Sequence, residues 1–107
     1  MKIIKLAEFL AMPEGTIYAQ YEPCIFRELQ IKHNTLDDTC WHHSPLINID
    51  ADNTDDYCDK LERRGESIDL DLEGWMRQSE YDPEELFAVF EKKDLEQWIE
   101  VFKNANA

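Results

Sequence analysis

The spacing of apolar residues predicts a helix at each end of the chain. Leu6, Phe9 and Leu10 fall at i, i+3 and i+4, on one face of a helix that must end before Pro13. Near the other end, the segment 94–102 carries the clearest helical stripe in the sequence. That stripe consists of Leu95, Trp98, Ile99 and Phe102. Each segment can bury one side while the other side faces water.

A third helix is predicted over 55–64, in the middle of the chain. Asn53 or Thr54 can cap it, because a side-chain oxygen there accepts a hydrogen bond from a free first-turn amide. Two aspartates in the first turn suit the positive end of the helix dipole, and Gly65 marks the end of the helix. We expect this helix to pack through Tyr57, Cys58 and Leu61.

Three strands are expected in the first half of the chain. Turn-forming residues at Pro13 and Gly15 lead into a strand at 16–21. A second strand at 24–32 is expected to pair with it as a hairpin. A third strand lies within 39–49, where Ser-Pro interrupts the pattern.

The second half adds two strands with different patterns. Segment 67–73 alternates apolar and polar residues, which is typical of a half-buried strand, and 86–90 is apolar on both faces, as in a fully buried strand. Segment 75–85 is expected to form a loop that includes the turn at Tyr81, Asp82 and Pro83. Short strands and helices joined by brief connections predict an α+β fold, a small and mostly antiparallel sheet packed with N-terminal, central and C-terminal helices.

Length and composition predict one soluble domain. A chain of 107 residues has room for one core, so we expect a single acidic α+β domain over 1–107. The longest wholly apolar run, 86–90, is far shorter than the ~20 residues of a membrane helix, and no export signal is visible. Three cysteines at unequal spacing, Cys24, Cys40 and Cys58, favour reduced thiols and a cytoplasmic location.

The net charge excludes one class of partner and points to another. Acidic residues outnumber Lys and Arg by 24 to 11, giving a formal net charge of -13. A protein that binds nucleic acid through cationic contacts with phosphate is therefore excluded. The excess is concentrated in 50–85, which holds fourteen acidic and four basic residues.

Helix and strand periodicity would gather these acids on one side of the molecule. On a strand at 67–73, Asp69, Asp71 and Glu73 share one face about 7 Å apart, comparable to phosphates along an extended nucleic-acid strand. Trp75 follows in a polar loop, where an exposed tryptophan resembles an interface anchor, with packing inside the loop as the rival interpretation. The candidate partner-binding residues are Asp55, Asp56, Asp59, Glu62, Asp69, Asp71, Glu73 and Trp75.

The acidity could also serve solubility or the binding of a divalent cation. Acidic faces keep small domains soluble, and carboxylates are the ligands that hard divalent cations prefer. The sequence from Asp50 opens like a calcium-binding loop, but its sixth position is Asp55 instead of glycine and its twelfth is Leu61 instead of glutamate. An EF-hand is therefore excluded.

The segment from Cys40 to His43 contains the one local cluster of soft and borderline metal ligands, which are Cys40, His42 and His43. No second ligand pair at zinc-site spacing accompanies them, which favours packed or surface histidines. Cys40 beside His42 has the residue types for nucleophilic catalysis, but acidic surroundings are expected to raise the pKa of the thiol. No catalytic residue, metal or cofactor is assigned.

Four segments carry a resemblance to a known group of proteins. They are MPEGTIY at 12–18, YEPCIF at 21–26, GESI at 65–68 and LFAVFEKKDL at 86–95. Together they resemble small acidic phage- and prophage-encoded proteins of unassigned function. The resemblance implies the product of a mobile element that binds and disables host machinery, such as a CRISPR effector or a restriction enzyme.

The prediction is thus a non-catalytic, phage-type inhibitor of a host nucleic-acid-handling or defence protein. It would act in the cytoplasm of the bacterial host, through an acidic surface that mimics nucleic acid and binds a basic surface on a host protein. No direct contact with nucleic acid or membrane is expected. The alternatives are a metal-dependent hydrolase and a structural or regulatory phage protein whose acidity serves only solubility.

Overall fold

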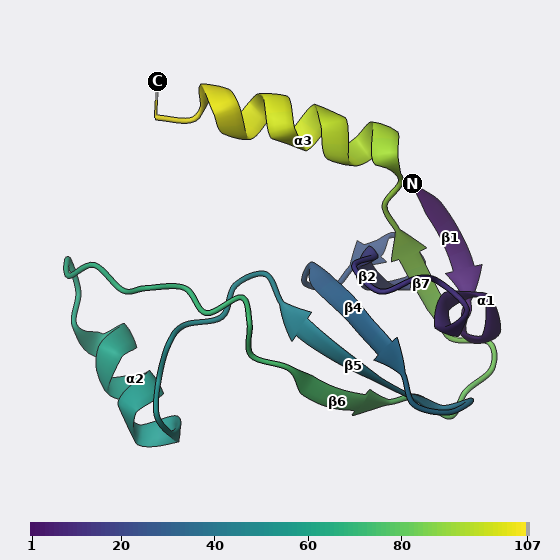
Figure 1. The fold of residues 1–107 in the computed structure, drawn as a ribbon, viewed down its shortest axis with the longest axis horizontal. Coiled ribbons are helices and arrows are strands. Elements are labelled where there is room, and N and C mark those ends of the chain that lie inside the picture. Colours follow the sequence, from purple (N-terminus) through teal and green to yellow (C-terminus); the bar gives the residue numbers. More distant parts are fainter. Residues whose placement is uncertain (107) are drawn as a thin grey trace.

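The computed structural model describes residues 1–106, in which seven strands form one antiparallel sheet and three helices accompany it (Figure 1). The strands lie in the order β1-β7-β2-β4-β5-β6, and β3 pairs with β2 beside this path. The elements are β1 (Lys2–Lys5), α1 (Leu6–Leu10), β2 (Ile17–Glu22), β3 (Ile25–Phe26), β4 (Gln30–Thr35), β5 (Cys40–Pro45), α2 (Thr54–Glu62), β6 (Met76–Ser79), β7 (Leu86–Val89) and α3 (Lys92–Asn104). The predicted α+β class is confirmed.

Strand β7 lies inside the sheet, although it comes late in the sequence. It pairs with β1 on one side and with β2 on the other, so Ala88 lies opposite both Ile3 and Ala19. Phe87, Ala88 and Val89 are all buried. The unbroken apolar run at 86–90 therefore correctly predicted a strand covered on both faces.

The core gathers around the ring of Phe9, which α1 lays on one face of the sheet. This ring stacks on Phe87 with centroids 4.1 Å apart, and it lies 4.6 Å from the ring of Tyr18 and 5.1 Å from that of Trp41. The indole Nε1 of Trp41 donates a hydrogen bond to the Tyr18 hydroxyl at 3.0 Å. The two polar atoms of the cluster thus satisfy each other inside an apolar core.

The sheet curls around this core. Gln78 on β6 donates from its side-chain amide to the Oε1 atom of Gln20 on β2, at 2.7 Å. In the sheet order β4 and β5 stand between these two strands. A direct contact between their side chains is possible only because the intervening strands bend, so the edge strand β6 approaches the middle of the sheet.

Lys32 on β4 ties the turn after α1 to the sheet. Its side chain is only 1% exposed, and its ammonium donates to the carbonyl oxygens of Met12 at 3.0 Å and His33 at 3.1 Å. The backbone adds two bonds, from Lys32 N to Thr16 O and from Gly15 N to Lys32 O, both 2.8 Å. Burial lowers the pKa of Lys32.

The structure corrects the prediction for the segment before β6. No strand forms over 67–73, where only Leu70 makes an isolated bridge, to Ile49. The alternating apolar residues have no sheet face to cover, and Leu70 is 58% exposed. Instead 76–79 occupies the free edge of β5 as β6, within the segment expected to be a loop.

Three smaller differences concern the other elements. Lys2–Lys5 forms β1, which the sequence pattern did not indicate, and the strand expected at 24–32 is divided between β3 and β4. The central helix is confirmed at Thr54–Glu62, but Tyr57, Cys58 and Leu61 are not buried. Within residues 1–106, no helix combines the length and apolarity needed to cross a bilayer.

Only α1 contributes helical residues to the core. Neither α2 nor α3 contains a buried residue, and Figure 1 shows both projecting from the sheet, α2 beyond the end of β5 and α3 from the end of β7. The radius of gyration is 15.7 Å, compared with ~13 Å for a compact chain of this length. The sheet and α1 therefore form the body, and the other two helices are appendages.

Replacing the Lys32 ammonium should destabilise this body. In Lys32→Met the aliphatic stem is kept, but the Met12 carbonyl loses its partner, so we expect a loss of about 1–3 kcal/mol in the free energy of unfolding. Urea denaturation followed by tryptophan fluorescence measures it. The control is Lys92→Met at the exposed start of α3. Equal stability of the two variants would contradict the structural role of Lys32.

Candidate functional site

The excursion between β5 and β6, residues 46–75, contains all the predicted partner-binding residues. We call it the acidic arm, because it holds ten carboxylates and three basic side chains. It includes α2 and leaves the sheet at the end of β5 (Figure 1). Helix and strand periodicity predicts that these acids gather on one face, but no strand forms at 67–73 to arrange them in that way.

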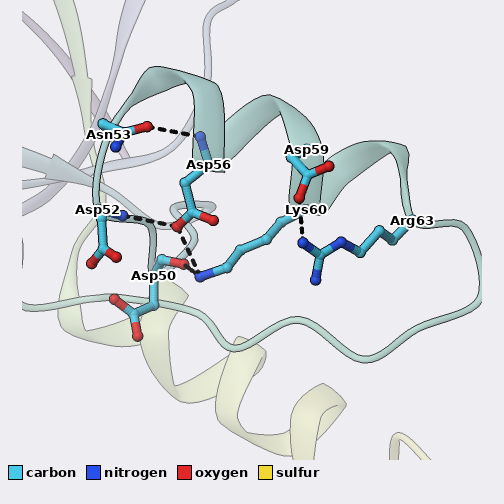
Figure 2. A network of polar contacts seen from close by, with 7 residues as sticks. All are labelled: Asp50, Asp52, Asn53, Asp56, Asp59, Lys60 and Arg63. Carbon is cyan, nitrogen blue, oxygen red and sulfur yellow. Dashed lines mark hydrogen bonds and ion pairs between the residues drawn. The ribbon is translucent and has the colours of Figure 1, made fainter.

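Part of the arm's charge is used to hold α2 together (Figure 2). The Asn53 side chain caps the helix by accepting from Asp56 N at 2.9 Å. The Asp56 carboxylate accepts from Asp52 N at 3.0 Å and forms an ion pair with Lys60 at 3.2 Å. These contacts, led by the Asp52 amide, lower the pKa of Asp56. Lys60 also donates to Asp50 O at 2.7 Å, which fixes the helix to the chain that precedes it.

The other predicted acids of α2 are more exposed. Asp59 forms an ion pair with Arg63, one turn further along (Figure 2). Asp55 and Glu62 are exposed, and no ion pair within 1–106 involves them. The helix therefore offers two unpaired carboxylates and one that is paired on the surface.

The predicted row of carboxylates at 69–73 is not formed as a row. Asp71 turns back to its own backbone, where its Oδ1 atom accepts from Glu73 N at 3.0 Å and Gly74 N at 3.2 Å. Asn48 fixes the backbone of Asp71 from the other side, with bonds of 2.8 Å and 3.1 Å. Asp69 and Glu73 are exposed. Without a strand at 67–73, the regular 7 Å repeat along one face is lost.

The helix and the later segment nevertheless lie side by side. A hollow of about 140 Å³ is lined by Lys60 and Arg63 of α2 and by Asp69 of the later segment. Two basic side chains thus separate the two groups of carboxylates. This arrangement lowers the repulsion between them and allows the arm to keep a high density of charge.

The arm also exposes large apolar side chains, of which the sequence analysis singled out only Trp75 as an exposed residue. The exposed set consists of Ile47, Tyr57, Leu61, Leu70, Leu72 and Trp75. Exposed apolar side chains on one segment make that segment a candidate binding surface. The apolar residues that alternate along 67–73 could have indicated these exposed side chains, but the sequence analysis assigned them to the buried face of a sheet.

Trp75 is held on one face and open on the other. Its ring stacks on His33 with centroids 4.1 Å apart and planes 15° apart, and it lies 6.0 Å from the His42 ring. The side chain still remains 55% exposed. Stacking on His33 restricts the rotamers of this partly open ring, which is the preorganisation that an interface anchor would need.

Hydrogen bonds to neighbouring polar side chains hold all three histidines on β4 and β5. His33 Nε2 is 2.7 Å from Ser44 Oγ, His42 Nδ1 is 2.8 Å from Asn34 Oδ1, and His43 contacts the side chain of Gln30. Within 1–106, no three His, Cys, Asp or Glu side chains converge to hold a metal ion.

The pKa of the Cys40 thiol is shifted in the direction opposite to the one predicted from the sequence. The thiol lies 2.9 Å from the Ser79 hydroxyl and 3.3 Å from the Arg77 guanidinium. Hydrogen bonding, first from Ser79 and then from Thr39 and Arg77, lowers its pKa instead of raising it. The acidic arm does not set this environment, because β6 supplies Arg77 and Ser79. The side chain is buried, which keeps the thiol from substrates.

Comparison with protein families, with curated proteins and with solved structures finds no match for this chain.

Two of the histidines should make the stability depend on pH. Burial lowers the pKa values of His33 and His43, so the fold favours their neutral forms. The stabilisation is fully present above the pKa of an unfolded histidine and is lost as the pH falls from that value through the lower pKa of the folded state. We expect the free energy of unfolding to decrease between about pH 7.5 and 5.5, and to decrease less in His33→Gln/His43→Gln. Urea titrations across this range measure both slopes, and equal slopes would refute the assignment.

Proposed function

We propose that the protein is a non-catalytic binding module that inhibits a host nucleic-acid-handling or defence protein. The observation that carries this proposal is the acidic arm, where exposed apolar side chains are interleaved with unpaired carboxylates on a segment separate from the core. Its binding surface comprises Asp55, Glu62, Asp69, Glu73, Leu70, Leu72 and Trp75.

The two kinds of side chain would act at different stages of binding. Carboxylates steer a basic partner toward the arm and raise the association rate. The apolar residues then leave water on contact and slow dissociation, with Trp75 as the fixed anchor. A surface whose acidity served only solubility would have no need for exposed leucines.

A basic groove that holds nucleic acid is the partner surface that fits this chemistry. The arm offers a local excess of negative charge, as nucleic acid does, but without a regular repeat of carboxylates. Competition would therefore depend on charge density and apolar contact together. The resemblance to phage-encoded proteins supports a bacterial host enzyme as the target, in the manner of an anti-CRISPR or anti-restriction protein.

The charge of the arm can be tested without disturbing its folding contacts. Neutralising the four carboxylates of this binding surface as Asp55→Asn/Glu62→Gln/Asp69→Asn/Glu73→Gln should abolish protection of phage DNA from restriction or CRISPR interference in bacteria that express the protein. The matched control removes four carboxylates elsewhere, as Glu8→Gln/Glu14→Gln/Asp38→Asn/Glu100→Gln, and should retain protection. Loss in both variants, or in neither, would rule out a role specific to the arm.

The apolar anchor gives a second test. We expect Trp75→Ala to weaken binding to the restriction or CRISPR protein that the wild-type protein inhibits by more than about tenfold, as hot-spot truncations do. The control is Leu36→Ala, at an exposed residue outside the arm, which should leave binding unchanged. Surface plasmon resonance on the purified pair measures the change, and circular dichroism checks the fold. An effect of Trp75→Ala on the association rate alone would assign Trp75 to steering and contradict anchoring.

A further inference from the structure

The apolar stripe of α3 is covered over its first half only. Leu95 and Trp98 are partly buried, and the Trp98 ring lies 4.8 Å from that of Phe90. Ile99 is 49% exposed and Phe102 is 68% exposed, where the helix projects beyond the sheet (Figure 1). A helix of this length is marginal in water unless its apolar face is covered, so the second half of α3 has the pattern of a packed helix without anything packed on it.

An apolar groove continues the same surface into the body of the protein. It has a volume of about 680 Å³ and runs between the turn after α1, the start of β2 and the junction of β7 with α3. Its walls include Met12, Ile17, Val89, Phe90 and Leu95. Leu95 belongs to both surfaces, so the stripe of α3 begins at the mouth of the groove.

The charge on α3 indicates which kind of partner can cover its exposed stripe. The helix carries three acidic and three basic side chains, whereas the whole chain has a net charge of -13. It is therefore a surface on which two copies of the chain can approach without the repulsion that their acidic arms would cause. A basic partner, in contrast, would find nothing here to attract it.

We propose that two copies of the protein dimerise by antiparallel packing of their α3 helices. Pairing about the point midway between Trp98 and Ile99 places each Trp98 opposite the second copy's Ile99. The same pairing places Leu95 opposite the second copy's Phe102. The most exposed ring of the helix is thereby brought to the mouth of the groove that Leu95 lines.

The charged flank of the stripe favours the antiparallel direction. Glu96 and Lys103 lie on the same side of α3, two turns apart. Antiparallel packing brings the same flank of the two helices together and sets each Lys103 beside the second copy's Glu96, whereas parallel packing would set this flank against the opposite flank of the second copy. The interface would bury about 1,000 Å² in total, at the lower limit for a specific contact, so a weak dimer is expected.

The first test is the molecular mass in solution as a function of concentration. Sedimentation velocity on the full chain, from about 1 to 500 µM, should show a monomer–dimer equilibrium with a dissociation constant in the micromolar range. Ile99→Glu/Phe102→Glu should remain monomeric throughout. Gln97→Glu/Lys93→Glu, which adds charge on the opposite face, should still dimerise. A wild-type protein that is monomeric at every concentration, or a stripe variant that dimerises as the wild type does, would overturn the proposal.

A charge-reversal cycle tests the direction of packing. Glu96→Lys and Lys103→Glu should each weaken the dimer by about three- to tenfold, since each replaces two opposite-charge contacts with like-charge ones, and the double variant should restore it. Failure of the double variant to restore the dimer would overturn the antiparallel arrangement. Added salt separates this contact from binding by the acidic arm, because an apolar dimer persists at high salt and an electrostatic complex dissociates.

Discussion

The stacking of Phe9 on Phe87 holds a short helix against a strand that lies near the other end of the sequence. A helix of five residues has no stability of its own, so α1 exists because its phenyl ring is enclosed by the rings of Tyr18, Trp41 and Phe87. This contact in turn places the turn after α1 over β4, where Lys32 fastens it. The body of the protein is therefore a curled sheet closed by one aromatic cluster.

Because this core is complete without them, α2 and α3 are free to serve other purposes. Their side chains contribute nothing to the central cluster, and each carries features that a solitary domain does not require. One helix belongs to a strongly acidic surface with apolar anchors, and the other carries a neutral amphipathic stripe. Because the two surfaces differ so much in charge, we propose different partners for them, a basic protein for the arm and a second copy of the chain for the C-terminal helix.

The sequence predicted those elements whose signal lies within their own residues, as an apolar run, a helix cap or a helical stripe. The run at 86–90 became a buried strand, the cap at Asn53 formed as expected, and the stripe from Leu95 to Phe102 is helical. The wrong strand at 67–73 and the missed strand at 76–79 share one cause, since alternation at 67–73 has the period of a strand but needs a sheet edge to pair with. Strand β6 occupies that edge, and its polar sequence carries no signal of its own.

Local charge could be read from the sequence more reliably than the arrangement of individual side chains. The acidic residues of the arm lie in the segment that the charge count indicated. However, the carboxylates of Asp71 and Asp56 accept hydrogen bonds from backbone amides, and Lys60 and Arg63 lie between the two groups of carboxylates. Which carboxylates remain unpaired depends on turn geometry and on contacts between distant residues. The lowered pKa of Cys40 depends on Arg77 and Ser79, which only the pairing of β5 with β6 brings near.

The insertion point of the acidic arm has a further consequence. Strands β5 and β6 are adjacent and antiparallel, with His43 opposite Met76, so the chain leaves and re-enters the sheet at neighbouring positions. Each doubling of the length of such a loop changes the entropic cost of closing it by only ~0.6 kcal/mol. The sheet therefore tolerates changes of sequence in the segment that we propose contacts the target. Successive variants of the acidic arm could bind different targets while the β-sheet stays unchanged.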